Sequence, residues 1–382
     1  MSRTTTALVL TEINGPFELR EIELDSLQSD EALVEIHYTG ICHTDLSCAK
    51  GVLPCAPGAV LGHEGAGVVV SKGSDVTSVS EGDKVLLSFS HCETCPPCLS
   101  GHPAYCHDFN LRNFGGKRPD GSSAVVLPGK KPVFSSFFGQ SSWARHALVH
   151  RSSLVRVPPE TELGLLAPLG CGVQTGAGAV LNSLNVREGS SLAVFGVGSV
   201  GMSAIMAGKL RGAKTIIAID VQPARLELAK RLGATHCVVS SKDVVEDIRK
   251  ICPPVGVDFA LDCTGITSVI ETMIASLGTK GRASTAGAPG FGSTITVDVM
   301  EHLTYGKEYV GCCEGDSLPS EFIPYLIEMH RQGKLPLEEL VTFYSVKDYE
   351  KALEDSKTGA ALKAVMKWDD LALHEKTRVN KL

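Results

Sequence analysis

The chain has 382 residues, enough for two ordinary domains, and its hydrophobic share of 43% and charged share of 21% are typical of globular proteins. The formal net charge of −7 argues against a nucleic-acid binder, which usually carries a basic stripe. The first residues hold no long apolar run and no small-residue cleavage site, and no segment approaches the roughly 18 apolar residues needed to span a bilayer, so we expect a cytoplasmic protein without membrane contact.

Strands dominate the first part of the predicted fold. Alternating or branched residues between Gly, Asp and Ser predict strands at residues 17–24, 31–42, 65–73 and 83–89. Residues 107–142 are expected to form loops, because turn signals recur there at Gly115-Gly116, Pro119-Asp120-Gly121 and Pro128-Gly129.

After Pro168 the pattern changes to alternating strands and helices. Helices are expected after Gly201 and from Arg225, and such alternation favours a parallel sheet covered on both faces. Short apolar runs predict the strands of this sheet at residues 191–195, 215–220, 237–240, 257–263, 282–288 and 309–313. The last part of the chain is expected to hold a helix near residues 321–332 and a strand near residues 364–368.

A glycine-rich motif, Gly196-Val-Gly198-Ser-Val-Gly201, follows the first strand of the predicted parallel sheet. The first glycine permits a tight turn, the second lets the backbone approach a pyrophosphate, and the third lets helix and strand pack closely. Asp220 ends the next strand, where a carboxylate can accept hydrogen bonds from ribose hydroxyls and repel a 2′-phosphate. We therefore expect NAD. Arg225 could instead help to bind a 2′-phosphate, or it is a solvated residue at a helix start.

Thirteen cysteines in a chain without an export signal indicate metal sites or free thiols more than disulfides. Four of them form a compact quartet with the spacing Cys92-x2-Cys95-x2-Cys98-x7-Cys106. Four thiolates at this spacing can enclose one tetrahedral Zn²⁺, and a closed site without an open position for substrate is structural. Free thiols or disulfides are the alternative interpretations.

A second candidate metal set is dispersed along the chain. Cys42 and His63 lie at the ends of predicted strands, and Cys171 precedes the predicted nucleotide-binding region. Two cysteines and one histidine leave a fourth position of a zinc ion open for water or substrate. Alone, His63 reads as an ordinary turn histidine and Cys171 as a buried thiol, so the prediction depends on their joint context.

Together these motifs resemble the zinc-containing medium-chain alcohol dehydrogenase family over nearly the whole chain. The resemblance implies an α/β protein with a GroES-like β-rich catalytic domain and a Rossmann domain, a doubly wound parallel sheet that binds the coenzyme. The expected division is a catalytic domain with both zinc sites at residues 1–172, an NAD-binding domain at 173–315, and a segment at 316–382 that completes the catalytic domain. We therefore expect two Zn²⁺ ions per subunit, one catalytic and one structural, together with NAD.

The family also implies roles for individual residues around the catalytic zinc. Its ligands would be Cys42, His63 and Cys171. Glu64 matches a glutamate that can ligate the metal transiently, and Asp45 would accept the ring N–H of the histidine ligand and so fix its tautomer. Thr44 would supply the hydroxyl that hydrogen-bonds the alkoxide.

Other positions match the coenzyme and substrate sites of the family. Thr175 and Val200 would press the nicotinamide from one side, and Lys363 would bind the pyrophosphate where relatives often carry Arg. The substrate pocket would be apolar with three aromatic rings, which favours a hydrophobic or aromatic primary alcohol and its aldehyde. Its residues would be Leu53, Phe89, Leu111, Phe137, Phe138 and Ala288.

One departure from the family concerns the proton relay. Many relatives carry a histidine five residues after the first ligand cysteine, but this chain has Ser47, which cannot act as a base at neutral pH. Either His43 or water would then complete the relay.

Three competing interpretations remain open at this stage. A glutathione-dependent formaldehyde dehydrogenase shares both zinc sites, although an apolar pocket argues mildly against it. A zinc-ribbon binding module without catalysis fits poorly with the acidic charge and the Rossmann motif, and intact ligands argue against a non-enzymatic regulator. The expected partners are a small alcohol or aldehyde and further copies of the chain, in a homodimer or homotetramer.

Overall fold

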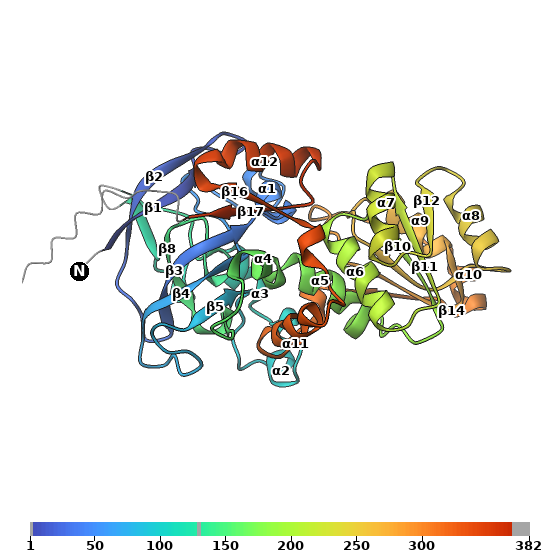
Figure 1. Cartoon of the computed structure of the whole chain (residues 1–382), viewed down its shortest axis with the longest axis horizontal. Helices are drawn as coiled ribbons and strands as arrows, with labels where there is room; N and C mark the ends of the chain where they lie inside the picture. Colours follow the sequence, from blue (N-terminus) through green and yellow to red (C-terminus); the bar gives the residue numbers. More distant parts are fainter. Residues whose placement is uncertain (1–2, 128–130, 369–382) are drawn as a thin grey trace, which may run out of the picture.

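Two large sheets of different kinds organise the chain, one in each of the two lobes seen in Figure 1. The computed structural model describes residues 3–127 and 131–368. One lobe holds a seven-stranded sheet with the order β16-β17-β3-β4-β5-β9, with β8 paired to β3, and the other holds a six-stranded sheet. These sheets confirm the predicted combination of a β-rich GroES-like part and a Rossmann-like part, whereas the domain boundaries at residues 172 and 315 stay a prediction.

The seven-stranded sheet combines strands from the first part of the chain with two strands from its last part. Its C-terminal strand β17 runs antiparallel to β3, with Val365 opposite Gly40, so the last described segment completes the sheet that the first part of the chain begins. The strands of this sheet are β3 (Glu31–Gly40), β4 (Gly65–Lys72), β5 (Lys84–Leu87), β8 (His146–His150), β9 (Leu154–Arg156), β16 (Val341–Ser345) and β17 (Lys363–Lys367).

A smaller four-stranded sheet packs beside it in the same lobe. Its order is β1-β2-β6-β7, and its first strand was not expected from the sequence. Buried residues of this strand contribute to the core, among them Leu8 and Leu10. The strands are β1 (Arg3–Leu10), β2 (Phe17–Leu24), β6 (Val125–Leu127) and β7 (Lys131–Pro132).

The six-stranded sheet is parallel throughout and follows the order β12-β11-β10-β13-β14-β15. Helices cover it in the second lobe (Figure 1), as the predicted alternation requires. Its strands are β10 (Ser191–Phe195), β11 (Thr215–Asp220), β12 (His236–Val239), β13 (Val257–Asp262), β14 (Leu277–Thr285) and β15 (Glu308–Gly311). The helices are α6 (Ser199–Leu210), α7 (Pro223–Leu232), α8 (Val244–Ile251), α9 (Thr267–Ala275) and α10 (Val299–Tyr305).

The expected starts of two helices were wrong by two or three residues. Helix α6 begins at Ser199, so Gly201 lies inside its first turn. A side chain on Gly201 would collide with the carbonyl oxygen of Gly196, because this helix starts immediately behind the turn after β10. Helix α7 begins at Pro223 and not at Arg225, since proline at the first helical position needs no hydrogen-bond partner for its nitrogen.

The prediction of loops alone at residues 107–142 was wrong. Helix α3 (Phe109–Phe114) and strand β6 form within this region, whereas the turn expected at Pro128-Gly129 lies outside the described residues. Phe114 packs on the ring of Phe138 at a centroid distance of 5.2 Å. Burial of these aromatic rings stabilises a helix that the turn signals did not indicate.

Five further helices precede or follow the parallel sheet along the chain. Helix α5 lies against α6 with its backbone, since a side chain on Gly176 would collide with the carbonyl oxygen of Val200. These helices are α1 (His43–Ala49), α4 (Leu163–Leu166), α5 (Gly172–Gly178), α11 (Pro319–Arg331) and α12 (Tyr349–Thr358). Within the described ranges, no single helix is long and apolar enough to cross a membrane, and one pair of segments, bent by 56°, matches a span by length and composition only.

Candidate active site and metal centres

The cysteine quartet lies in a surface segment, residues 92–106, around the short helix α2 (Pro96–Leu99). We call it the cysteine segment. The Sγ atom of Cys98 lies 3.5 Å from that of Cys95 and 3.9 Å from that of Cys92, and the Sγ atoms of Cys95 and Cys106 are also 3.9 Å apart. Four sulfur atoms at 2.3 Å from one tetrahedral zinc ion would be separated by about 3.8 Å. All four are free thiols and not disulfides, and their spacing fits one such ion.

Backbone N–H groups favour thiolates in this quartet. The amide of Cys95 donates to the sulfur of Cys92 at 3.2 Å, and the amide of Cys92 donates to the sulfur of Cys106 at 3.3 Å. Although burial opposes ionisation, hydrogen bonds from Thr94 lower the pKa of the Cys92 thiol to about 6. Cys92 is therefore the anionic sulfur ligand near neutral pH, whereas burial raises the pKa of the Cys98 and Cys106 thiols.

The dispersed candidate ligands come together at the ends of three segments. Cys42 caps the start of α1, Cys171 precedes α5, and His63 lies just before β4. One ligand atom from each lies within 4.8 Å of the other two. The Nε2 atom of His63 is buried and has no hydrogen-bond partner, which is costly unless a metal ion accepts its lone pair.

Asp45 organises this site through three hydrogen bonds. Its Oδ1 accepts the Nδ1–H of His63 at 3.0 Å and the amide of Gly62 at 3.0 Å, and its Oδ2 accepts the amide of Cys42 at 2.9 Å. Both side chains of the His63–Asp45 pair are fully buried. This carboxylate directs the free Nε2 of the histidine toward the two sulfur atoms, so the residues present fit a zinc ion.

Aromatic rings form one wall of the candidate metal site. The Phe138 ring stacks on the His63 ring with centroids 4.4 Å apart, and the Phe137 ring meets it edge-on at 5.4 Å. Leu53 and Phe89 lie in the same buried cluster. Thr44 places its Oγ1 atom 3.6 Å from the sulfur of Cys42.

Two of the six expected pocket residues are not in this wall. Leu111 is 62% exposed, because α3 turns its phenylalanines inward and this leucine outward. Ala288 is exposed in the segment after β14, and its backbone lies against Gly265 near the coenzyme cleft. The sequence pattern could not show which side of α3 faces the core.

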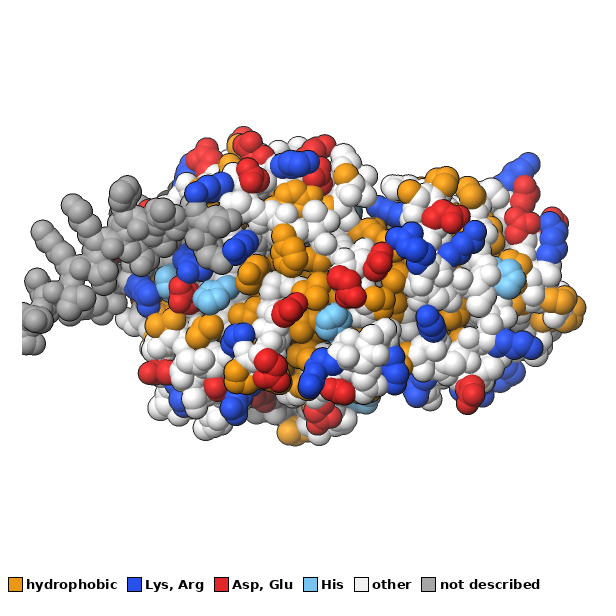
Figure 2. Space-filling model, in the orientation of Figure 1, with side chains coloured by type: hydrophobic (Ala, Val, Ile, Leu, Met, Phe, Trp, Pro, Cys, Tyr) orange, Lys and Arg blue, Asp and Glu red, His pale blue; other side chains and the backbone are white. Residues whose placement is uncertain are grey.

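A cleft of about 340 Å³ connects the candidate metal site with the glycine-rich motif. Figure 2 shows hydrophobic side chains gathered over the middle of one face of the molecule, between the two lobes. From the Rossmann-like lobe the cleft is lined by Gly196, Gly198, Val200, Gly201, Asp220 and Arg225. From the other lobe it is lined by Cys42, His43 and Lys363, whereas Thr175 is buried in α5 and does not line it.

Asp220, the last residue of β11, is already held by two backbone amides. Its Oδ2 accepts the amide of Val197 at 2.9 Å, and its Oδ1 accepts the amide of Gln222 at 2.9 Å. The guanidinium of Arg225 lies 3.7 Å from Oδ2. Each carboxylate oxygen retains a lone pair for a further donor, and the arginine is paired with this carboxylate.

Lys363 and Glu64 form a buried pair next to the metal site. The Nζ atom of Lys363 donates to the two carboxylate oxygens of Glu64 at 2.8 and 3.0 Å and lies 3.3 Å from the carbonyl oxygen of Ile41. The amide of Gly172 also donates to Glu64, at 3.1 Å. In this arrangement the lysine expected to bind pyrophosphate holds the glutamate expected to approach the metal.

Sequence reasoning missed Glu314, which lies beyond the end of β15. The residue as a whole is partly exposed, but its carboxyl group is enclosed, and burial raises its pKa to about 7. Its Oε1 lies 3.8 Å from the sulfur of Cys171. The available signal was its position beyond the carboxyl end of a parallel strand, the edge where such sheets bind ligands.

Comparison with known proteins agrees with this geometry. Residues 28–159 match the model of the alcohol dehydrogenase GroES-like domain, and residues 199–331 match that of the zinc-binding dehydrogenase domain. The chain is 38% identical to a geraniol dehydrogenase of Castellaniella defragrans, over 94% of this chain and 96% of the relative. It is 33% identical to an S-(hydroxymethyl)glutathione dehydrogenase of Saccharomyces cerevisiae, over 96% of each protein.

A solved structure is similar along almost the whole chain as well. The crystal structure of benzyl alcohol dehydrogenase from Acinetobacter calcoaceticus superposes with a TM-score of 0.92 and 41% identity, covering 96% of this chain and 99% of that one. The chain therefore belongs to the zinc-dependent medium-chain alcohol dehydrogenase family and is an enzyme, which excludes the binding-module and regulator interpretations.

Proposed function

We propose that this enzyme is an NAD-linked alcohol dehydrogenase that interconverts a hydrophobic or aromatic primary alcohol and its aldehyde. One observation carries the proposal: the unpartnered Nε2 of His63 faces two thiols at the end of a cleft that also contains the glycine-rich motif. Such a cleft brings a metal-held alcohol and a dinucleotide to the same place.

The residues of the site divide the work. Cys42, His63 and Cys171 would hold the catalytic zinc, which when bound makes an alcohol oxygen easier to deprotonate. Asp45 keeps the histidine in the required tautomer. The Thr44 hydroxyl would accept the alcohol proton while releasing its own toward solvent, and a bound dinucleotide would supply the hydride acceptor.

The preference for NAD rests on Asp220. Its carboxylate reaches the cleft with free lone pairs for a ribose, and its charge repels a 2′-phosphate. Arg225 is engaged by the same carboxylate, which weakens its use as a phosphate ligand. We expect Asp220→Gly to shift the ratio of kcat/KM values toward NADP, by at least about tenfold for a loss of roughly 1.4 kcal/mol. A wild-type enzyme that already prefers NADP would contradict this proposal.

The substrate class rests on the aromatic wall of Phe137 and Phe138 against His63. Relatives named for geraniol and benzyl alcohol support an apolar alcohol. The relative named for S-(hydroxymethyl)glutathione supports a second candidate. Both candidate substrate classes can be tested by measuring kcat/KM with NAD and with NADP for benzyl alcohol, geraniol, ethanol and S-(hydroxymethyl)glutathione. The highest value for the glutathione adduct would overturn the proposed apolar alcohol.

We further propose a homodimer formed through the edge of the parallel sheet. Strand β15 ends the sheet, and α10 beside it exposes apolar side chains such as Val299, Met300 and Leu303. Unpaired strand edges and apolar patches of this kind favour association. Light scattering should give twice the mass of one chain, and Leu303→Lys should lower it toward one chain. A wild-type monomer would contradict the dimer, and a tetramer would require a second interface.

A further inference from the structure

The Glu314 carboxylate is poorly served by hydrogen-bond donors. Its Oε2 lies 3.3 Å from the side-chain nitrogen of Gln174, which donates over shorter distances to the carbonyl oxygen of Gly170 at 2.6 Å and to the hydroxyl of Ser88 at 2.7 Å. An amide nitrogen has only two hydrogens, so the third acceptor receives little. An enclosed carboxylate without good donors is costly unless a cation lies nearby.

The neighbouring sulfur cannot supply that donor once a metal is bound. The Oε1 atom lies 3.8 Å from the sulfur of Cys171, and a cysteine that ligates zinc is a thiolate without a hydrogen. Two anions would then be adjacent. A divalent cation held by Cys171 compensates both charges at once.

Strained backbone holds Glu314 in this place. Three successive residues, Glu314, Gly315 and Asp316, have φ angles of 47°, 71° and 46°. Two of them are not glycine, and such strain persists only where surrounding contacts enforce it, often at functional sites. The contacts come from two sides of the turn, since the Asn182 side chain donates to the Gly315 carbonyl at 3.0 Å and the ring of His102 lies 2.7 Å from Asp316.

The other carboxylate beside the metal site is differently placed. Glu64 already accepts from the Lys363 ammonium and from the amide of Gly172. Moving it toward a metal would leave a buried ammonium without its partner, which is strongly unfavourable. Glu314 has no such commitment.

We propose that Glu314 binds the catalytic zinc ion directly through its carboxylate when no alcohol is present, in the role that the family resemblance gives to Glu64. This inference rests on the proposed function, since it requires the ion at Cys171. Glu314 thereby retains the ion in the resting enzyme and is an additional metal ligand of this chain.

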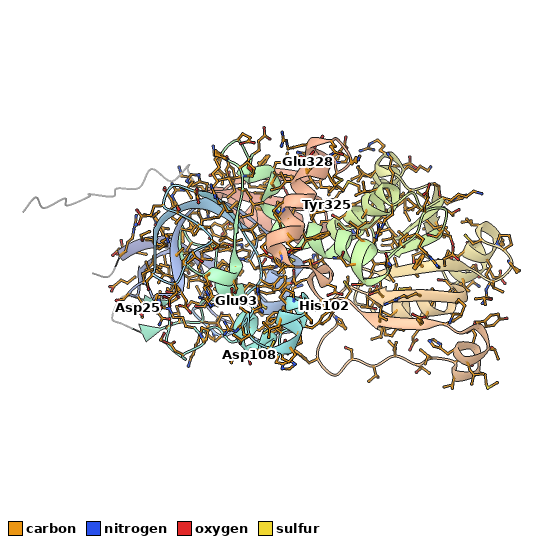
Figure 3. The ribbon with its side chains drawn as sticks, turned by 90° about the horizontal axis from the view of Figure 1, so that it is seen from below. Asp25, Glu93, His102, Asp108, Tyr325 and Glu328 are labelled. Atoms are coloured by element: carbon orange, nitrogen blue, oxygen red, sulfur yellow. The ribbon has the colours of Figure 1, made fainter. Side chains whose placement is uncertain are left out.

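The experiment measures metal retention as well as turnover. Zinc release from the purified enzyme is followed against a chelator, and the visible spectrum is recorded with Co²⁺ replacing the catalytic ion. Glu314→Gln should weaken retention of one of the two ions by about 10-fold to 100-fold and change the cobalt bands. Glu314→Asp keeps the charge but shortens the reach, so it should show the same direction of change. Glu328→Gln, on the exposed face of α11 (Figure 3), is the matched control and should behave as wild type.

The outcomes separate this inference from the function on which it rests. Unchanged zinc retention and cobalt bands in Glu314→Gln would overturn it, and so would a change in Glu64→Gln alone. Wild-type behaviour of Glu314→Asp would show that only charge matters and would also overturn direct binding. If Cys171→Ser keeps both zinc ions, the proposed function itself fails. Glu314→Asp also keeps the test valid if Glu314→Gln does not fold.

Discussion

The two candidate metal sites of this chain are built in opposite ways. The cysteine quartet lies between residues 92 and 106, in the partly exposed cysteine segment. The Cys-His-Cys set draws on residues 42, 63 and 171, lies deep in the molecule and opens on the cleft between the lobes. The first site needs only the local course of the chain, whereas the second needs the whole fold.

This difference explains what each site can do. Backbone amides of the quartet's own loop donate to its sulfur atoms, and four thiolates close the coordination shell of a zinc ion. The dispersed set has three candidate ligands, a supporting carboxylate at Asp45 and an aromatic wall. A local site can therefore stabilise the segment that holds it, and a distributed site can position a substrate.

The largest expected effect is the loss of catalysis in Cys171→Ser. This substitution removes a ligand of the distributed site, so the enzyme should keep one zinc ion of two and lose at least roughly a thousand-fold in kcat/KM, since a metal Lewis acid contributes several kcal/mol. Metal analysis, turnover and circular dichroism check the three parts, with the fold expected to remain. Retained turnover would sink the assignment of the catalytic zinc.

The next effect concerns proton transfer beside the same site. Thr44→Ala should lower kcat/KM by at least about a hundred-fold without loss of zinc, because no hydroxyl then links the alcohol to the exit route. Thr44→Ser, which keeps the hydroxyl, is the control and should stay near wild type.

The exit of the proton can be tested at two further positions. His43 is exposed and lines the coenzyme cleft, and Ser47 is half-buried on the same helix. If His43→Gln leaves the pH–rate profile unchanged while Ser47→His alters it, water carries the proton in the native enzyme. If neither variant moves the profile, proton release does not limit the rate.

In the cysteine quartet, by contrast, substitution should act on stability. Cys95→Ser should remove the other zinc ion and lower the free energy of unfolding by about 4 kcal/mol, which corresponds to a fall in Tm of roughly 8 to 16 °C. Turnover per folded molecule should change much less than in Cys171→Ser. Thermal unfolding with and without added zinc measures the effect, and a wild-type Tm would show that the quartet does not stabilise the fold.

The same contrast sets how far the sequence alone could lead. The quartet and the glycine-rich motif are local patterns, and the structure places their residues as the spacing predicts. Leu111 was misplaced because its direction depends on which face of α3 packs inward. Glu314 was missed because its position after a parallel strand indicates only the ligand-binding edge of the sheet, whereas its proximity to Cys171 arises from the strained turn after β15.

Two hydrogen bonds connect the two kinds of site, and the first of them defines the smallest expected effect. His102, in the cysteine segment (Figure 3), contacts Asp316 in the strained turn. The Tyr105 hydroxyl of the same segment donates to the Gly311 carbonyl at 3.2 Å. The cysteine segment therefore braces the turn that carries Glu314. The two metal sites are thus mechanically connected, although their ligands are separate.

His102→Ala should weaken this brace only slightly. The histidine side chain is 54% exposed, so its pair with Asp316 contributes less than about 1 kcal/mol, and the free energy of unfolding should fall by no more than that. If the brace positions Glu314, retention of the catalytic zinc should also fall, by about fivefold or less, while the quartet keeps its ion. His236→Ala, at an exposed position on β12, is the control. Equal zinc retention in both variants, measured with the same chelator, would show that the two sites are independent. The cysteine segment would then stabilise only itself.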